Sequence, residues 1–171
     1  EDDDIEVKYV VANDDVASAP KAVKEQRHGI AGGFFMWKVG GARAAKGGSL
    51  DDVIASAQNV VNRTKSICVG LEPCVIPALG HSNFKIEDGT MEFGVGHHGE
   101  AGTKVEKLKS ASEMAQEMAE TILNDFDFEE GKEVAVMLSG LGATPVMELY
   151  VLYDEVEKVL SKGWAQSMEN L

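Results

Sequence analysis

The sequence predicts an α/β domain of α+β character, with two layers in which a mixed β-sheet is covered by helices on one face. Short apolar runs typical of strands alternate along the chain with longer segments of helical periodicity. Asp88-Gly89 lies between two of these runs and is typical of a hairpin turn. Two sequences of the type Ser-x-x-acid mark the starts of amphipathic helices.

The composition is that of one soluble globular domain, or of one domain with part of another. The chain has 171 residues, of which 44% are hydrophobic and 26% charged. Its formal net charge of −13 opposes binding to nucleic acid or to an anionic membrane. No apolar run approaches the length of a membrane span, and no signal peptide is visible. With only Cys68 and Cys74, we expect reduced thiols and a cytoplasmic location.

The first third of the chain is expected to form one strand and two helices. Residues 5–12 are mainly apolar and end at polar turn residues, which is typical of a strand. Residues 29–46 have helical character despite glycines at 32, 33, 40 and 41, which we expect where another backbone packs closely. A clearer helix is expected from Ser49, because Ser49 and Asp52 resemble a capping box with Asp in the place of the usual Glu.

The remaining elements are predicted from the same signals. Apolar runs predict strands at 67–71, 84–86, 91–95 and 133–138, with a loop over 72–83 and a hairpin over 84–95. A capping box predicts a helix from Ser110, and the acidic residues 125–131 are expected to be a solvated loop. The last helix is expected to run to about Leu160, with Thr144 as N-cap and Pro145 in its first turn.

The strongest candidate site is the segment Gly94-Val95-Gly96-His97-His98-Gly99-Glu100. Glycine lets a backbone turn sharply and come close to a ligand, and histidine suits nucleophilic or proton-transfer chemistry near neutral pH. An imidazole in a glycine-walled loop after a strand indicates a small-molecule site. A glycine-rich turn that merely contains two histidines is the alternative.

A metal site is not expected from this chain. Cys68 and Cys74 lack the spacing of zinc ligands. His97 and His98 are adjacent, so in an extended segment their side chains would point to opposite sides.

Two further segments admit a structural and a functional interpretation. Residues 140–145 connect a strand to a helix but lack the lysine of a phosphate loop, so they form a structural turn or an anion site at the helix N-terminus. Asp14 and Asp15 end a strand, as turn residues or as carboxylates of a site.

Several segments, taken together and in this order, resemble the dihydroxyacetone kinase family, in its dihydroxyacetone-binding unit (DhaK). The likeness extends from about residue 5 to about residue 160. The matching segments are Asn13-Asp14-Asp15-Val16, Arg27-His28-Gly29-Ile30-Ala31-Gly32, residues 60–66, Glu72-Pro73-Cys74-Val75-Ile76-Pro77-Ala78, residues 91–100 and residues 140–150.

The resemblance implies a role for each candidate residue. A ring nitrogen of His98 would bond to the carbonyl carbon of dihydroxyacetone to give a hemiaminal, with Gly96 and Gly99 letting the substrate approach. Only a ketone or aldehyde accepts this nucleophile, so polyols such as glycerol are rejected. The resemblance also implies a homodimer and a DhaK/DegV-like second domain. ATP with Mg, or a phosphotransferase-system donor, would act through a nucleotide-binding (DhaL-like) partner subunit or domain, with no cofactor on this chain.

The chain departs from the family pattern in ways that define further expectations. His97 stands where the family usually has an aliphatic residue, and the family's Gly-Ser-Gly-His-Glu loop and catalytic aspartate belong to a segment that precedes this one. We therefore expect residues 1–28 to end a first α/β domain. Residues 29–171 would form a DhaK-type second domain, incomplete at its C-terminus, with residues missing near 164. By itself this segment would lack kinase activity. A non-catalytic paralogue that binds the same ketone and regulates transcription is the alternative.

Overall fold

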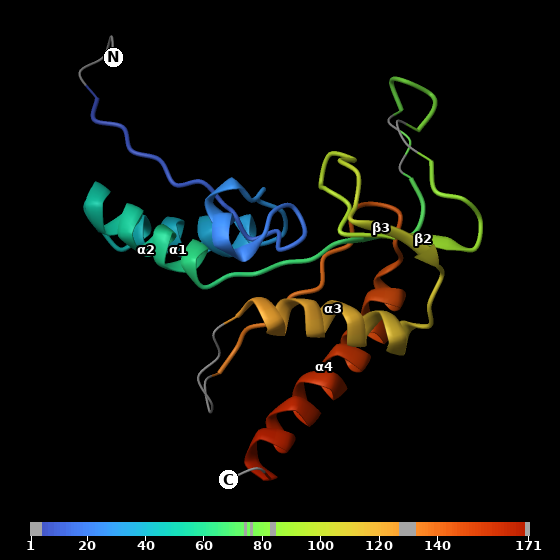
Figure 1. Ribbon diagram of the computed structural model, residues 1–171. Helices are drawn as coiled ribbons and strands as arrows, with labels where there is room; N and C mark the ends of the chain where they lie inside the picture. The colour runs from blue at the N-terminus through green and yellow to red at the C-terminus, as the bar shows by residue number, and fades with distance from the viewer. Residues whose placement is uncertain (1–4, 74, 76, 83–84, 127–132, 170–171) are drawn as a thin grey trace.

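The computed structural model describes residues 5–73, 75, 77–82, 85–126 and 133–169, with side chains described as far as residue 162. Figure 1 shows a pair of helices on the N-terminal side of the molecule and a small sheet with two longer helices on the other side. In chain order the elements are the 3-10 helix η1 (Lys21–Gln26), α1 (Gly33–Ala45), α2 (Leu50–Asn62), β1 (Val69–Gly70), β2 (Thr90–Phe93), β3 (Lys104–Lys107), α3 (Ala111–Asp125) and α4 (Val146–Glu169).

Both predicted capping boxes are present, and they fix where α2 and α3 begin. The Ser49 hydroxyl accepts the backbone N–H of Asp52, and the Asp52 carboxylate accepts the backbone N–H of Ser49. Ser110 and Glu113 make the same reciprocal pair at the start of α3. Each box satisfies two backbone donors that a helix N-terminus otherwise leaves without partners, which is worth about 1 kcal/mol.

The glycines at 32, 33, 40 and 41 were expected to lie where another backbone packs closely. This is confirmed at Gly40, whereas at Gly32 the close neighbour is a side chain. A Cβ on Gly40 would lie 3.5 Å from Cβ of Ala57, so α1 and α2 approach closely there. A Cβ on Gly32 would lie 2.5 Å from Cγ of Asp14, so this glycine leaves room for a carboxylate rather than for a helix. A Cβ on Gly41 would meet nothing within 4 Å.

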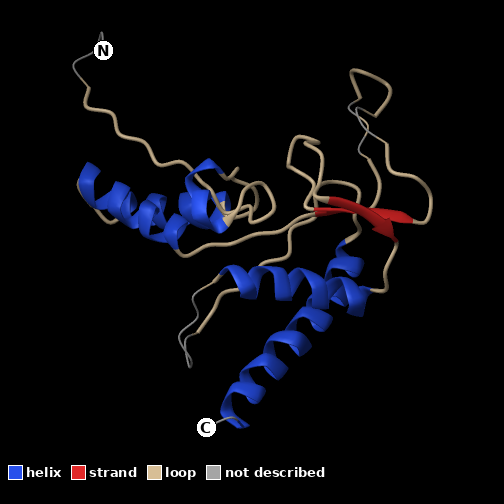
Figure 2. Ribbon diagram, viewed as in Figure 1, coloured by secondary structure: helices blue, strands red, loops and turns tan. Residues whose placement is uncertain are grey.

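The α/β class is confirmed, because helices accompany a small sheet (Figure 2). The strands of this sheet lie in the order β1-β2-β3. All three strands are antiparallel, with Val69 opposite Phe93 and Met91 opposite Glu106. Among the described residues the one parallel pairing is an isolated bridge between Asp15 and Ser66. The sheet itself is therefore antiparallel rather than mixed.

The predicted hairpin over 84–95 is wrong, because β2 pairs with the following strand β3 and with the earlier strand β1. The Asp88-Gly89 turn does form, since the Thr90 N–H donates to the carbonyl oxygen of Glu87 over 3.0 Å and Gly89 has φ +75°. This turn leads into β2 without a strand before it. Residue 84 lies outside the described residues.

The strands predicted at 5–12 and 133–138 are also wrong. Neither segment has a strand assigned, and no backbone hydrogen bond joins either one to the backbone of another described residue. A strand needs a neighbour for its backbone groups, and neither segment has one among the residues that the structure describes. Lys8 of this first segment instead forms an ion pair with Asp51 of α2, and Val7 and Tyr9 are exposed.

Helices α3 and α4 lie below the sheet in the view of Figure 1. Met91 and Phe93 are the buried face of β2, and α3 is tied to β3 by an ion pair of Lys104 with Glu117. The rest of this core comes from Met114, Ala115 and Ala119 of α3 and Val156 of α4. Helix α4 packs against α3, begins one residue after Pro145 and ends at Glu169, beyond the predicted Leu160. None of the helices, over the residues described, is long and apolar enough to cross a membrane.

Candidate functional site

The glycine-rich segment after β2 forms a closed loop. The Gly94 N–H donates to the carbonyl oxygen of Cys68 over 2.7 Å, and Gly94 has φ +77°. Two further backbone hydrogen bonds close the loop. The Gly99 N–H donates to the carbonyl oxygen of Gly96 over 3.2 Å, and the Gly96 N–H donates to the carbonyl oxygen of Glu100 over 2.8 Å. His97 and His98 therefore occupy the two central positions of a turn.

The turn places both imidazoles on the outside of the loop. His97 and His98 are exposed, and the His98 side chain keeps 80% of its accessible surface. Their rings meet edge to face with centroids 5.1 Å apart. The expectation that they point to opposite sides is wrong, because the segment is a turn rather than an extended strand. Gly99, at φ +88°, takes the left-handed conformation that reverses the chain.

The Glu100 carboxylate folds back beneath the turn and holds His98. Oε2 of Glu100 accepts the backbone N–H of His98 over 2.8 Å, and Oε1 lies 3.3 Å from Nδ1 of its ring. The backbone N–H groups of Glu100 and His98 lower the pKa of the Glu100 carboxyl. A Cβ on Gly96 would lie 2.3 Å from Oε2 of Glu100. Gly96 thus makes room for a carboxylate of the protein, where the sequence suggested room for a ligand.

Beside this loop lies a polar cavity of about 250 Å³. It separates the chain around residues 15–28 from the loop over 94–103. Gly96 and Glu100 line it, but His98 and Gly99 do not. Its lining residues are Asp15, Ala17, Ser18, His28, Gly94, Gly96, Glu100, Ala101, Gly102 and Thr103. With carboxylates on two sides, the cavity can accept hydrogen bonds from the hydroxyl groups of a small polar molecule.

The two neighbouring aspartates have different roles. Asp14 accepts the backbone N–H groups of Gly32 at 2.8 Å and Ile30 at 3.3 Å, so it organises the start of α1. Asp15 is 1% exposed and lines the cavity, and its Oδ1 accepts the N–H of Ala17 over 3.0 Å. Burial raises the pKa of Asp15.

Sequence reasoning weighed this aspartate pair mainly as a strand-ending turn, and it gave His28 no role in a site. The sequence does contain a signal for this part of the site, because Asp14 and Asp15 directly follow an apolar run. Carboxylates next to a buried segment need hydrogen-bond or charge partners.

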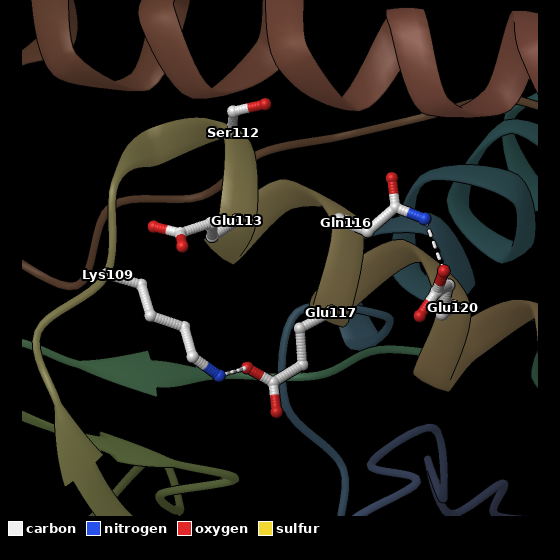
Figure 3. A pocket seen from close by; sticks show the side chains of 6 residues that line it. All are labelled: Lys109, Ser112, Glu113, Gln116, Glu117 and Glu120. Atoms are coloured by element: carbon white, nitrogen blue, oxygen red, sulfur yellow. Dashed lines mark hydrogen bonds and ion pairs between the residues drawn. The ribbon is translucent and has the colours of Figure 1, made fainter.

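A second hollow, of about 510 Å³, lies along the surface of α3 (Figure 3). Its polar side chains already have partners within the protein. Nζ of Lys109 lies 2.5 Å from Oε2 of Glu117, Gln116 bonds to Glu120, and Glu113 belongs to the capping box. These contacts stabilise α3 and its junction with β3, so we assign the hollow to the fold.

The described part of the chain gives little support for a reactive cysteine or for a metal site. Burial raises the pKa of Cys68 to about 11, which leaves its thiol protonated and unreactive at neutral pH; Cys74 lies outside the described residues. No group of three or more His, Cys, Asp or Glu side chains that could hold a metal occurs among the residues that the structure describes. Gly142, with φ +135°, is typical of the structural turn considered at 140–145.

Comparison with known proteins gives a family match over nearly the whole chain. The model of the family described as the Dak1 domain matches residues 1–170. The dihydroxyacetone-binding subunit DhaK of PTS-dependent dihydroxyacetone kinase 1 from Listeria innocua is 35% identical over 169 residues, which are 99% of this chain and 51% of that protein. D-erythrulose kinase from Mycolicibacterium smegmatis is 36% identical over 156 residues, which are 91% of this chain and 27% of that protein.

A solved structure shares the fold. The dihydroxyacetone kinase operon co-activator Dha-DhaQ superimposes with a TM-score of 0.84 at 29% identity, over 95% of this chain and 50% of that chain. The chain thus spans about half the length of the relatives it matches, or less.

Proposed function

This chain belongs to the Dak1 domain family, and we propose that it is part of the substrate-binding unit of a dihydroxyacetone kinase. The observation that carries the proposal is the position of His98. Its imidazole stands exposed on a turn that two backbone hydrogen bonds close, and a carboxylate contacts one of its nitrogens. A nucleophilic side chain needs this combination of access and fixed orientation.

The chemistry is an addition of His98 to a ketone. Nε2 of the neutral ring attacks the carbonyl carbon of dihydroxyacetone, a new N–C bond forms, and the π electrons of the carbonyl move to oxygen. The oxygen gains a proton and the ring loses its Nδ1 proton, so the product is a neutral hemiaminal. Glycerol has no carbonyl and cannot react in this way. Gly96 and Gly99 support this role by shaping the turn around His98.

Phosphorylation requires groups beyond those that we propose for this chain. Phosphoryl transfer needs a nucleotide with its metal clamp, or another donor, and a base for the accepting hydroxyl. We propose that a nucleotide-binding partner subunit or domain supplies ATP with Mg, or that a phosphotransferase-system protein supplies the phosphoryl group. Residues 1–28 are proposed to end a first α/β domain, and residues 29–171 to form the second domain.

A non-catalytic role is the second candidate function. The co-activator structure superimposes with a TM-score of 0.84, so this fold also serves a protein named as a regulator of an operon. A regulator that senses dihydroxyacetone would use His98 in the same way. The two roles differ in phosphoryl transfer, which the full-length protein would perform with a nucleotide-binding partner only if it is a kinase subunit.

Self-association is part of the proposal. Phe34 and Trp37 of α1 are exposed, with 49% and 72% of their surface accessible, on a helix whose buried residues are only Gly33 and Gly40. We propose that the full-length protein forms a homodimer. Light scattering that shows a monomer of the full-length protein would refute this.

The covalent role can be tested with dihydroxyacetone labelled with ¹³C at its carbonyl carbon. On binding to the full-length protein, the carbonyl signal should be replaced by the signal of a tetrahedral carbon, and His98→Ala should abolish the change. His97→Ala is the matched control and should keep the adduct. An adduct that persists in His98→Ala would overturn the assignment.

A further inference from the structure

We propose that Glu100 is a positioning residue that holds the ring of His98 in the tautomer protonated at Nδ1, so that the lone pair lies on Nε2. The inference rests on the covalent role of His98 proposed above. It assigns to Glu100 a task that no feature of the sequence indicates, since glutamates in surface loops are usually only solvated.

Two contacts fix the ring relative to the carboxylate. Oε2 of Glu100 accepts the backbone N–H of His98 over 2.8 Å, and Oε1 lies 3.3 Å from Nδ1 of the ring. An ionised carboxylate can only accept hydrogen bonds, so Nδ1 must carry the proton when this contact forms. In a neutral imidazole the other nitrogen, Nε2, then holds the lone pair.

The carboxylate is itself held in place by the loop. Gly96 has no side chain where Oε2 would otherwise clash, and its N–H donates to the carbonyl oxygen of Glu100 over 2.8 Å. Backbone N–H groups favour the ionised form of Glu100. Its one ion pair among the described residues is with His98. The group is therefore charged, oriented and aimed at a single ring.

The adjacent histidine provides an internal comparison. His97 shares the turn and touches the ring of His98, yet within the described part of the chain its side chain has no hydrogen-bond partner. Its tautomers are therefore not selected by a neighbouring group. This difference explains how a loop with two exposed imidazoles can present only one of them as an oriented nucleophile.

The same contact assists the addition. When Nε2 bonds to the carbonyl carbon, the ring becomes an imidazolium while the carbonyl oxygen becomes an alkoxide. The Glu100 carboxylate stabilises this cation through Nδ1–H. The Nδ1 proton then leaves to solvent as the alkoxide takes a proton from solvent, which closes the balance of atoms and charge.

The test is the tautomer of His98 in the full-length protein labelled with ¹⁵N at histidine. At a pH where the ring is neutral, long-range ¹H–¹⁵N correlation spectra should show Nδ1 protonated in the wild type and a mixture of tautomers in Glu100→Ala, which has no side-chain oxygen to accept the Nδ1 proton. The rate of adduct formation with dihydroxyacetone should fall about 10- to 100-fold in this variant, the range seen when the group that hydrogen-bonds a metal-binding histidine is removed. Glu92→Ala is the matched control, because Glu92 also holds this loop, through the N–H of Gly102 at 2.6 Å, without contacting His98.

The outcomes separate this inference from the covalent role. A wild-type ring protonated at Nε2 would overturn the role of Glu100. This measurement uses the wild-type protein alone, so it does not depend on whether a variant folds. An unchanged tautomer and adduct rate in Glu100→Ala would also overturn it. A ring protonated at Nδ1 in a protein that forms no adduct would support the role of Glu100 and would refute the covalent role of His98.

Discussion

Arg27 and Asp125 form a buried bidentate ion pair between segments 98 positions apart. Nη1 and Nη2 of Arg27 each lie 2.7 Å from one carboxylate oxygen of Asp125, and Nε donates to the carbonyl oxygen of Ala19. The side chains keep 1% and 9% of their accessible surface. The pair ties the segment that carries Asp15 and His28 to the last residue of α3, so it helps to set the cavity wall opposite the histidine loop.

Removal of one partner should destabilise the fold strongly. Arg27→Met leaves a buried carboxylate without its cation, and we expect the free energy of unfolding to fall by about 3 kcal/mol. The double variant Arg27→Met with Asp125→Leu should recover part of this loss, because no charge is left unpaired. Urea denaturation of the full-length variants measures both values. Equal stability of the single variant and the wild type would contradict the structural role of the pair.

The same ion pair predicts a dependence of stability on acid. Arg27 lowers the pKa of Asp125 in the folded state below its value in the unfolded chain. The carboxylate therefore contributes its full stabilisation above about pH 4, the usual pKa of aspartate, and loses it as the pH falls through the lowered pKa. Urea denaturation at a series of acidic pH values should show a loss of stability that is smaller in Asp125→Asn than in the wild type, because this variant lacks the contribution of Asp125.

The raised pKa of Asp15 predicts a dependence of stability on pH of the opposite sign. Burial raises its pKa in the folded state, so its protonated form favours folding, and this contribution is lost as the pH rises from the unfolded towards the folded pKa. Asp15→Asn keeps an oxygen that can accept the Ala17 N–H and removes the buried charge. The variant should unfold at a higher urea concentration than the wild type at pH 7, and the difference should shrink at low pH. A lower midpoint at pH 7 would show that the ionised carboxylate stabilises the fold.

Local signals in the sequence predicted the helices, and their limits explain the errors. Both capping boxes involve residues three positions apart, so the sequence contains the whole interaction. Strand β3 has the sequence Lys-Val-Glu-Lys and only one apolar residue, so no periodic pattern identifies it. Its existence depends on pairing with β2, which lies more than ten positions earlier. The apolar runs at 5–12 and 133–138 have the composition of strands but no partner among the described residues.

In the candidate site, too, local features were predicted from the sequence and contacts between distant segments were not. Glycine spacing located the loop that carries His97 and His98, because glycines at a turn are a local requirement, whereas the choice of His98 rests on the family resemblance. The positive φ of Gly99 and the contact of Glu100 with His98 decide where the imidazoles point, and neither can be deduced from residue types. The cavity joins residues 15–28 to residues 94–103, so only the fold brings it together.

Two glycines near α1 should respond in opposite ways to alanine. In Gly32→Ala the new Cβ would lie 2.5 Å from Cγ of Asp14 and 2.7 Å from Cγ2 of Thr64, so we expect a loss of about 1–3 kcal/mol in the free energy of unfolding from overpacking. In Gly41→Ala the Cβ meets nothing within 4 Å, and alanine should stabilise the helix by about 0.5–1 kcal/mol. Thermal unfolding of both variants checks the pair. Destabilisation by Gly41→Ala would indicate that a partner covers this face of α1.

The 171-residue chain by itself should have no kinase activity. It spans about half the length of the DhaK subunit that it matches, and the described cavity offers carboxylates but no group to bind a nucleotide. The assay mixes the chain with a DhaL-like nucleotide-binding subunit, ATP with Mg and dihydroxyacetone, and measures dihydroxyacetone phosphate. The full-length protein under the same conditions is the positive control.

Turnover by the short chain comparable to that control would mean that one of its own carboxylates serves as the base. Asp14 is poorly suited to that role, since its oxygens already accept the N–H groups of Ile30 and Gly32. Asp15 and Glu100, which both line the cavity, would be the carboxylates to replace next. Loss of that turnover in Asp15→Asn but not in Glu100→Gln would identify the base.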